Sequence, residues 1–339
     1  MTVPLSCILG LSGKRLMKSE SVFLRDANPW GVILFARNVQ NPKQLKTLTQ
    51  KIRAATGRNT LIFIDQEGGR VQRMRAPHWN AFPTGEDYAA VYRRDREDGL
   101  RACYLGHRLI ADDLRAVGIT SNCAPVLDLP QPGADPIISD RALGNSVEHI
   151  VDMAHAAMSG LMSGGVAPVI KHIPGHGRAT VDSHKALPKI DTDRKTLEAS
   201  DFLPFRRLSD APMAMTAHAV YTHNSRSAVT VSRRSLTELI RAAIGFDGLL
   251  MTDDLDMKAL TGDLTRKTER SLKAGCDIAL QCSGRLADSV KVAKGAQCLS
   301  GRAFARAMIA ENCADHVTEF DREAAEVEFD ALMASLRHD

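Results

Sequence analysis

Eight short apolar runs, each bounded by turn-forming residues, constrain the fold of this chain more than any other feature. They are mostly continuous rather than alternating, which is typical of parallel strands that are buried on both faces. The runs are 6–11, 31–35, 60–64, 119–127, 166–170, 212–217, 248–252 and 277–281. The chain is therefore expected to form a buried parallel sheet.

Amphipathic stretches with a helical period separate these runs, and they cover residues 43–55, 97–116, 147–163, 235–244, 264–274 and 286–294. Gly118, Gly165, Gly245 and Gly275 each follow such a stretch and precede a strand, as glycines that end helices do. Eight strands alternating with helices predict an α/β fold, a (β/α)8 TIM barrel. The alternative is a doubly wound sheet, which usually has fewer strands and a glycine-rich phosphate turn.

The length of 339 residues leaves one or two domains open. Residues 1–300 hold all eight predicted strands and are assigned to one barrel domain. Residues 301–339 have no strand pattern, and 319–336 read as an amphipathic helix. We expect this C-terminal helical extension to pack on the barrel.

Charge and apolar content exclude two classes of partner. The net charge is only +4 and aromatic residues make up 5% of the chain, so neither a basic stripe nor a stacking platform for nucleic acid is expected. No apolar run approaches about 18 residues, so no membrane span is expected. A secretory signal is not evident, and the seven cysteines form no C-x-x-C pair. We expect a cytoplasmic monomer that acts on a small molecule.

Polar residues follow five of the predicted strands. They are Asp65 to Arg70 after the third, Asp128 after the fourth, Lys171 to Gly177 after the fifth, His218 after the sixth and Asp253 to Met257 after the seventh. The carboxyl ends of barrel strands meet at one rim, where the active sites of this fold lie. Charged groups inside a rim are costly unless they are paired or used. We therefore expect an active site at this rim.

Asp253 follows a strongly apolar strand and is the leading candidate for chemistry. A carboxylate there can act as a nucleophile, an electrostatic stabiliser or a metal ligand. Asp254 is adjacent, and the strand period places neighbours on opposite faces, so only one of the two is expected to be chemical. The alternative is that Asp253 caps the following helix.

The segment from His172 to Asp193 is a long loop with Asp182 and His184 inside it. Loops of this length in compact domains are usually lids or binding loops. In a strand-like conformation, residues two apart lie on one side, where the carboxylate can hold one imidazole tautomer. The pair is then a proton-transfer unit; the alternative is a solvated loop histidine.

Four further residues near the rim are candidates for ligand binding. Lys171 and His172 end the fifth strand and could bind hydroxyls or a carbonyl oxygen. Arg73 and Arg141 lie in loops after the third and fourth strands and could bind hydroxyls or a carboxylate. Each arginine could equally be a surface residue.

A catalytic metal is not expected, and neither is another cofactor. The rim holds His172, His176, His184 and His218, but no H-x-H or H-E-x-x-H spacing occurs. Pro174 lies between His172 and His176 and prevents a helix that would align them.

Taken together, these motifs resemble the β-N-acetylglucosaminidases of glycoside hydrolase family 3. The resemblance covers about residues 5–300 and rests on segments 31–38, 65–73, 124–128, 171–177, 182–184, 216–218, 245–248 and 252–257. The most specific part is Lys-His-Ile-Pro-Gly-His-Gly at 171–177, followed by Asp-Ser-His at 182–184.

The resemblance implies a retaining, metal-independent hydrolase on a TIM barrel. By this resemblance, Asp253 is the nucleophile that forms a covalent glycosyl-enzyme intermediate, His184 is the general acid/base, and Asp182 is its partner. The residues that match the pocket for N-acetylglucosamine are Asp65, Arg73, Arg141, Lys171 and His172. The family pattern usually has an aromatic residue at the position of Met74, and another before the glycine in the segment Ala142-Leu143-Gly144. We expect both departures to alter loop packing rather than chemistry.

Larger relatives of this kind carry a second C-terminal domain, which we do not expect in a chain of this length. It resembles the single-domain cytoplasmic form of Gram-negative bacteria, which implies removal of terminal N-acetylglucosamine from 1,6-anhydro-N-acetylmuramic acid sugars, with or without peptide, in cell-wall recycling. One alternative is a phosphorylase, because a histidine repels phosphate less than a carboxylate does. Another is a non-catalytic sugar-binding protein, which would lack part of the nucleophile and dyad set.

Overall fold

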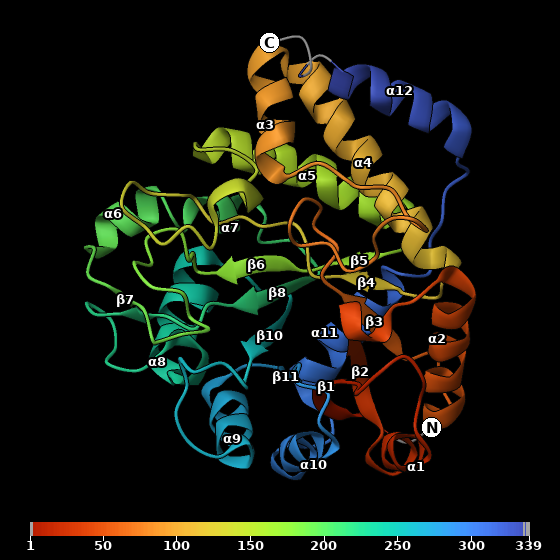
Figure 1. Cartoon of the computed structure of the whole chain (residues 1–339). Helices are drawn as coiled ribbons and strands as arrows, with labels where there is room; N and C mark the ends of the chain where they lie inside the picture. The colour runs from red at the N-terminus through yellow and green to blue at the C-terminus, as the bar shows by residue number, and fades with distance from the viewer. Residues whose placement is uncertain (1–2, 335, 337–339) are drawn as a thin grey trace.

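A single parallel sheet of nine strand segments forms the centre of the molecule (Figure 1). The computed structural model describes residues 3–334 and 336. The strands of this sheet are β1 (Leu5–Gly10), β2 (Pro29–Leu34), β3 (Leu61–Ile64), β4 (Ser121–Asn122), β5 (Ala167–Pro168), β6 (Ile170–Ile173), β8 (Met213–Thr216), β10 (Leu249–Asp254) and β11 (Ile278–Gln281). The eight predicted runs all contain strand, and the fifth run contributes two segments.

The sheet closes into a ring. Its order is β5-β4-β3-β2-β1-β11-β10-β8-β6, and β5 and β6 are separated only by Val169. The two ends of the sheet are therefore parts of one continuous segment, 167–173. The N–H of Val169 donates to the carbonyls of Asn122 and Ala124, and Lys171 forms a parallel bridge with Val126. This closed parallel sheet confirms the predicted TIM-type barrel and excludes the doubly wound alternative.

Helices surround the ring on its outer side (Figure 1). They are α1 (Lys18–Ala27), α2 (Pro42–Thr56), α3 (Gly85–Arg94), α4 (Arg96–Ala116), α5 (Val147–Ser163), α6 (Arg194–Ala199), α7 (Leu203–Arg207), α8 (Arg233–Ser235), α9 (Leu264–Ala274), α10 (Leu286–Gly295), α11 (Gly301–Asn312) and α12 (Arg322–Ala334). A π-helical segment, Leu236–Ile244, continues α8. Within the described part of the chain, none of the helices is long and apolar enough to cross a membrane.

The predicted helices have the boundaries that their sequences indicate. Asn41 accepts a hydrogen bond from the N–H of Gln44 at the start of α2, and Ser146 does the same for His149 at the start of α5. Gly165 and Gly245 have φ of +70° and +81°, which L side chains rarely adopt. Both glycines separate a helix from the following strand, as predicted.

Two strands differ from their predicted lengths. The run 119–127 was expected to be one strand, but β4 covers only Ser121–Asn122. Proline has no N–H for the ladder, and Pro125 interrupts this run. Pro168 likewise precedes the break at Val169 between β5 and β6.

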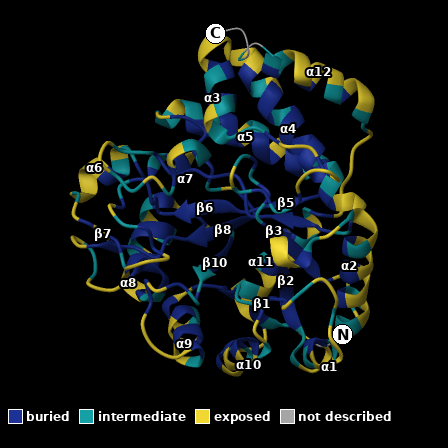
Figure 2. Cartoon of the chain, in the orientation of Figure 1, coloured by how far each residue is buried: buried dark blue, intermediate teal, exposed yellow. Residues whose placement is uncertain are grey.

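The core has a layer inside the ring and a layer between the ring and the helices. Inside the ring lie Ile8, Phe63, Met215, Met251 and Leu280, all nearly inaccessible to solvent. Figure 2 shows the strands of the ring mostly buried, whereas the helices expose their outer faces. Polar residues at the carboxyl ends of the strands are therefore held on a rigid, fully packed support.

The C-terminal tail packs at two places. Ala307 and Ala310 of α11 belong to the same buried cluster as Trp30 and Ile278, which lie at the starts of strands, so α11 covers the amino ends of the strands. The Trp30 indole donates to Glu311 over 2.6 Å. The predicted helix 319–336 is α12, Arg322–Ala334, and residue 335 lies outside the described residues. It lies against α3 and α4 (Figure 1).

A second, two-stranded sheet ties two rim loops together. β7 (Lys189–Ile190) pairs in parallel with β9 (Val220–Tyr221). This sheet was not predicted. It anchors the end of the long loop after β6 to the segment after β8, so this loop is fixed at both of its ends.

Candidate active site

A cavity of about 260 Å³ lies at the carboxyl ends of the barrel strands. Seven of the eight predicted site residues line it. The remaining one, Asp182, is hydrogen-bonded to His184, which is part of the lining. The polar side chains in the lining include Asp65, Glu67, Arg73, Arg141, Lys171, His172, His176, His184, Asp253 and Asp254. The predicted rim site is therefore one continuous cavity.

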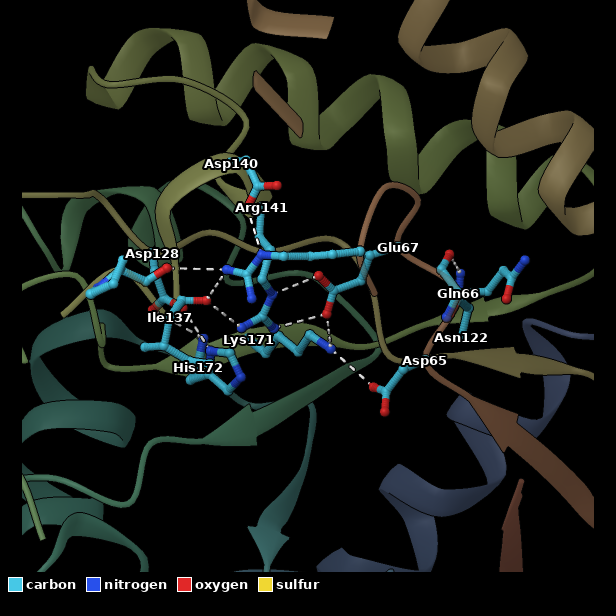
Figure 3. Close-up of polar contacts among 12 residues, drawn as sticks. Asp65, Gln66, Glu67, Asn122, Asp128, Ile137, Asp140, Arg141, Lys171 and His172 are labelled. Atoms are coloured by element: carbon cyan, nitrogen blue, oxygen red, sulfur yellow. Dashed lines mark hydrogen bonds and ion pairs between the residues drawn. The ribbon is translucent and has the colours of Figure 1, made fainter. Parts of the chain in front are cut away.

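One side of the cavity is a network of buried ion pairs (Figure 3). The Lys171 ammonium lies 3.1 Å from Asp65 Oδ1 and 2.6 Å from Glu67 Oε1. Arg73 Nη2 lies 3.0 Å from the other oxygen of Asp65. Arg141 binds Glu67 through two nitrogens, with Nε 2.8 Å from Oε2 and Nη2 2.9 Å from Oε1.

Opposite charges in this network keep its side chains ionised, although burial alone would favour their neutral forms. Burial alone would raise the pKa of Asp65, but the cations of Lys171 and Arg73 hold it well below its ordinary value. Burial of Glu67 is likewise outweighed by Arg141 and Lys171, and its pKa is about 2. The two carboxylates are ionised at neutral pH and keep the pKa of Lys171 above its ordinary value despite burial.

Tight turns place these side chains. The N–H of Glu67 donates to the carbonyl of Val71, and the N–H of Val71 donates to the carbonyl of Gly68. Gly68 has φ of +108°, and a Cβ there would lie 2.1 Å from the carbonyl oxygen of Pro83, so only glycine fits. Arg70 binds Asp140 from this turn, and so ties it to the short 3₁₀ segment 139–141 that carries Arg141.

His172 is oriented by Asp128, a fully buried residue. Asp128 Oδ2 lies 2.6 Å from His172 Nδ1, and its other oxygen accepts the backbone N–H groups of His172 and His176. Burial would raise the pKa of Asp128, but the neighbouring histidine lowers it. With Nδ1 bound to Asp128, Nε2 is the ring nitrogen of His172 left for other partners.

Asp253 and Asp254 end β10 and differ in proton affinity. Burial would raise the pKa of Asp253, but the imidazoles of His218 and His172 keep it below its ordinary value, and Asp253 also accepts the N–H of Asp254 over 2.8 Å. Burial raises the pKa of Asp254 to about 7, and the charges of Asp256 and Asp253 add to the rise. Asp253 is therefore the ionised member of the pair at neutral pH.

The alternative role of Asp253 as a helix cap is wrong. The next helix, α9, begins at Leu264, and Asp263 caps it by accepting the N–H of Thr265 over 2.9 Å. Asp253 also shares the cavity lining with Asp254, although the strand period predicted opposite faces.

Asp182 and His184 are paired, but not in the strand-like conformation that the sequence suggested. His184 Nδ1 lies 2.8 Å from Asp182 Oδ1, and the same oxygen accepts the His184 N–H, also over 2.8 Å. The carbonyl of Asp182 accepts the N–H groups of Lys185 and Ala186, so the segment is a turn. The hydrogen bonds from His184 lower the pKa of Asp182 against the effect of its burial.

The His184 side chain is 64% exposed, while that of Asp182 is only 12% exposed. The carboxylate therefore fixes one nitrogen of a ring whose other side faces the cavity and solvent. With Nδ1 hydrogen-bonded to Asp182, Nε2 is free to exchange a proton with a ligand.

Sequence reasoning placed four more residues of this lining or its support near the rim but did not assign them to the site: Glu67, Asp128, His176 and Asp254. Glu67 could have been assigned to it, because it follows Asp65 by two residues and shares its side of the chain. His176 is buried, and both of its ring nitrogens lack a hydrogen-bond partner among the described residues. Its pKa is lowered by burial.

Known proteins resemble this chain over most of its length. Beta-hexosaminidases from Alkalilimnicola ehrlichii and Thioalkalivibrio sulfidiphilus are 39% and 38% identical over 280 and 282 residues, about 81% of this chain and 80% of each relative. Among solved structures, NagZ from Neisseria gonorrhoeae in complex with N-trifluoroacetyl-D-glucosamine superposes with a TM-score of 0.85 at 31% identity, covering 98% of this chain and 97% of that one.

The family is shown by a match that includes nearly all of the barrel. Residues 9–312 match the model of the glycosyl hydrolase family 3 N terminal domain. These residues include every strand of the ring except the start of β1, and all the cavity-lining residues named above. The chain therefore belongs to glycosyl hydrolase family 3 and is a glycoside hydrolase.

Proposed function

We propose that this protein is a retaining β-N-acetylglucosaminidase that works through a covalent glycosyl-enzyme intermediate. One observation carries the proposal: the ionised Asp253 and His184, which is paired with Asp182, line the same cavity. Retention requires a nucleophile and a proton donor at one glycosidic bond, and these groups can supply both. The beta-hexosaminidase names of the relatives support the choice of sugar.

In the first step, Asp253 is the nucleophile. A carboxylate oxygen of Asp253 forms a bond to the anomeric carbon as the glycosidic C–O bond breaks. His184 acts as the general acid and gives its Nε2 proton to the departing oxygen. Asp182 keeps the ring oriented through Nδ1, as the 2.8 Å contact allows.

In the second step, water replaces the enzyme on the sugar. Neutral His184 takes a proton from water while the water oxygen bonds to the anomeric carbon. The ester bond to Asp253 breaks, and its electron pair returns to the carboxylate. Two displacements at one carbon restore the β configuration, and both Asp253 and His184 regain their starting states.

The N-acetylglucosamine unit is proposed to bind Asp65, Arg73, Arg141, Lys171 and His172. Together they offer a carboxylate acceptor, several N–H donors and an imidazole on one cavity wall. The N-trifluoroacetyl-D-glucosamine that accompanies the similar Neisseria structure supports a sugar of this class here.

The natural substrate is proposed to be N-acetylglucosaminyl-1,6-anhydro-N-acetylmuramic acid, with or without peptide, in cell-wall recycling. The motifs of the single-domain family members support this, as does the likeness to NagZ. We further propose that the protein acts as a monomer in the cytoplasm without a cofactor. Its seven cysteines are all free thiols, which is consistent with a reducing compartment.

Hydrolysis of 4-nitrophenyl N-acetyl-β-glucosaminide beside the plain β-glucoside tests the sugar assignment. We expect strong preference for the N-acetyl sugar, and equal activity on both contradicts the assignment. Asp253→Ala is expected to abolish turnover, and mass spectrometry with a 5-fluoro N-acetylglucosaminyl substrate, which keeps the 2-acetamido group, is expected to find the sugar attached to Asp253. Label on another residue overturns the nucleophile assignment.

The same assay separates hydrolysis from phosphorolysis. The reaction is run with and without inorganic phosphate, and the products are analysed by NMR. We expect free N-acetylglucosamine with β configuration at first release in both cases. Accumulation of the sugar 1-phosphate identifies a phosphorylase.

Release of N-acetylglucosamine from the anhydro disaccharide, with and without peptide, tests the natural substrate.

A further inference from the structure

We propose that Glu67 is a positioning residue for the sugar-binding wall of the cavity. Its buried carboxylate holds the Lys171 ammonium and the Arg141 guanidinium side by side, so that their remaining donors face the bound sugar. This inference rests on the proposed function, because it concerns how the same sugar is held. Glu67 is not one of the residues for which the motifs suggested a role.

The contacts of Glu67 account for both of its oxygens. Oε1 lies 2.6 Å from Lys171 Nζ and 2.9 Å from Arg141 Nη2, while Oε2 lies 2.8 Å from Arg141 Nε. The side chain is only 8% exposed, so the carboxylate has little water to compensate it. A carboxylate engaged in this way is neither a nucleophile nor a proton donor, and its contribution passes through the two cations.

The two cations come from separate parts of the fold. Lys171 belongs to β6, whereas Arg141 ends the short 3₁₀ segment 139–141 in the loop after β4. Two buried cations repel each other, and an anion between them offsets this repulsion. Glu67 supplies that anion from the turn after β3, and so links a strand of the ring to the loop after β4 (Figure 3).

Counting donors shows what is left for the sugar. Lys171 has three N–H donors, of which two point to Asp65 and Glu67. Arg141 has five, of which two go to Glu67 and one, from Nη1, to the carbonyl of Ile137. One donor of Lys171 and two of Arg141 remain, and their directions are set by the contacts with Glu67. Sugar hydroxyl and acetamide oxygens are acceptors that suit these donors.

Glu67→Gln tests the proposal because it keeps the shape and removes the charge. The dissociation constant of N-acetylglucosamine is measured by calorimetry, and kcat and KM with 4-nitrophenyl N-acetyl-β-glucosaminide. We expect a tenfold or larger loss of affinity for the sugar and a higher KM. A structural role alone would lower the thermal midpoint and the folded fraction, but leave the affinity of the folded enzyme unchanged.

Glu328→Gln is a matched control. Glu328 also binds an arginine through both oxygens, with Arg101 Nε and Nη2 each 2.7 Å away, but this pair is exposed and lies between α4 and α12. We expect no change in sugar affinity.

Glu67→Asp provides a second test if Glu67→Gln fails to fold. The aspartate keeps the charge but is too short to hold both cations. We therefore expect this variant to weaken sugar binding as well.

A double-mutant cycle with Arg141→Met tests whether Glu67 acts through the guanidinium. If it does, the combined loss in kcat/KM is much smaller than the product of the two single losses. Independent, multiplicative losses overturn the proposal, as does unchanged sugar affinity in both Glu67 variants. Failure of the wild-type enzyme to bind or cleave N-acetylglucosaminides contradicts the proposed function instead, so the two failures are distinguishable.

Discussion

At the residue scale, adjacent aspartates on one strand hold different protonation states. His218 and His172 keep Asp253 ionised, whereas burial and neighbouring charge raise the pKa of Asp254 to about 7. Different neighbours therefore separate the pKa values of two chemically identical side chains. This difference concentrates the negative charge at neutral pH on the residue that we propose as the nucleophile.

Asp254 gives a prediction about pH and stability. Its folded-state pKa lies above the ordinary value of 3.8, so the folded protein binds a proton that the unfolded chain releases between pH 4 and 7. Its contribution to stability is present below pH 4 and is lost as pH rises to 7. Asp254→Asn cannot ionise, and it is expected to gain about 2 kcal/mol relative to wild type between pH 4.5 and 8, after allowance for partial exposure.

Urea unfolding of both proteins at pH 4.5 and pH 8 measures this gain. The asparagine oxygen can still accept the N–H groups of Asp256 and Cys282 that Asp254 accepts now, so the folded geometry is retained. A stability difference between variant and wild type that is the same at both pH values contradicts the assignment of the titrating group.

His184→Ala gives a prediction that depends on the leaving group. The variant lacks the proposed proton donor, so substrates with poor leaving groups are expected to lose about 100-fold or more in kcat/KM. Activated aryl glycosides depart without a proton and are expected to lose much less. The rates on 4-nitrophenyl and methyl N-acetyl-β-glucosaminides are compared. Equal losses on the two substrates remove the acid/base assignment.

At this scale, residue types and spacing predicted which side chains reach the cavity, but not how they are paired. The contact of Asp182 with His184 was predicted, although it arises from a turn rather than from an extended strand. Glu67 and Asp128 were expected near the rim, but their contacts were not predicted, because their partners come from other strands. Contacts between distant segments depend on the register of the ring, which the local pattern does not encode.

At the element scale, the loop after β6 holds the Asp182–His184 pair and approaches the loop after β4 closely. The carbonyl of Gly177 accepts the N–H of Gln131, and a Cβ on Gly177 would lie 1.8 Å from the carbonyl oxygen of Leu129. β7 and β9 fix the other end of the loop. The position of the proposed acid/base therefore depends on backbone contacts far from His184 itself.

Gly177→Ala is expected to displace this loop, because backbone atoms on both sides must move to accept the methyl group. We expect kcat to fall about tenfold, with a loss of stability of about 1–3 kcal/mol. Gly13→Ala is the matched control, since no atom lies within 4 Å of the added carbon. Wild-type kcat in Gly177→Ala would show that the close approach does not position the loop.

Helices and strands were predicted best where one pattern is long and has clear ends. α5 and α9 have the predicted boundaries, Val147–Ser163 and Leu264–Ala274. The short elements β7 and β9 were missed, because two residues carry no measurable period. α1 and α3 were missed as well, although Thr84 and Asp87 form a capping box at the start of α3.

At the scale of the whole molecule, the C-terminal helix α12 strengthens the outer layer without contributing to the cavity. Phe329 packs against Tyr88 and Phe82, and Arg322 binds Asp112 and Asp113 of α4. No described residue of α12 lines the cavity. We propose that residues 301–339 extend the barrel domain, with α11 covering the base and α12 covering the side.

Deletion of residues 321–339 is therefore expected to lower stability while preserving kcat and KM at 25 °C. Loss of the buried Phe329 and Met333 side chains alone is expected to cost about 3–6 kcal/mol. Deletion of residues 301–339 also removes the cover over Trp30 and is expected to prevent stable folding. Thermal unfolding and steady-state assays measure both effects. A large change in KM in the shorter deletion contradicts the separation of α12 from the site.

The segment 167–173 has a consequence for how the enzyme becomes active. It supplies both ends of the sheet, and the same few residues carry Lys171 and His172 into the cavity. A chain in which the ring is still open thus lacks a complete form of the wall that we propose to bind the sugar, however well its helices have formed. We therefore expect catalysis to recover during refolding only once the ring has closed.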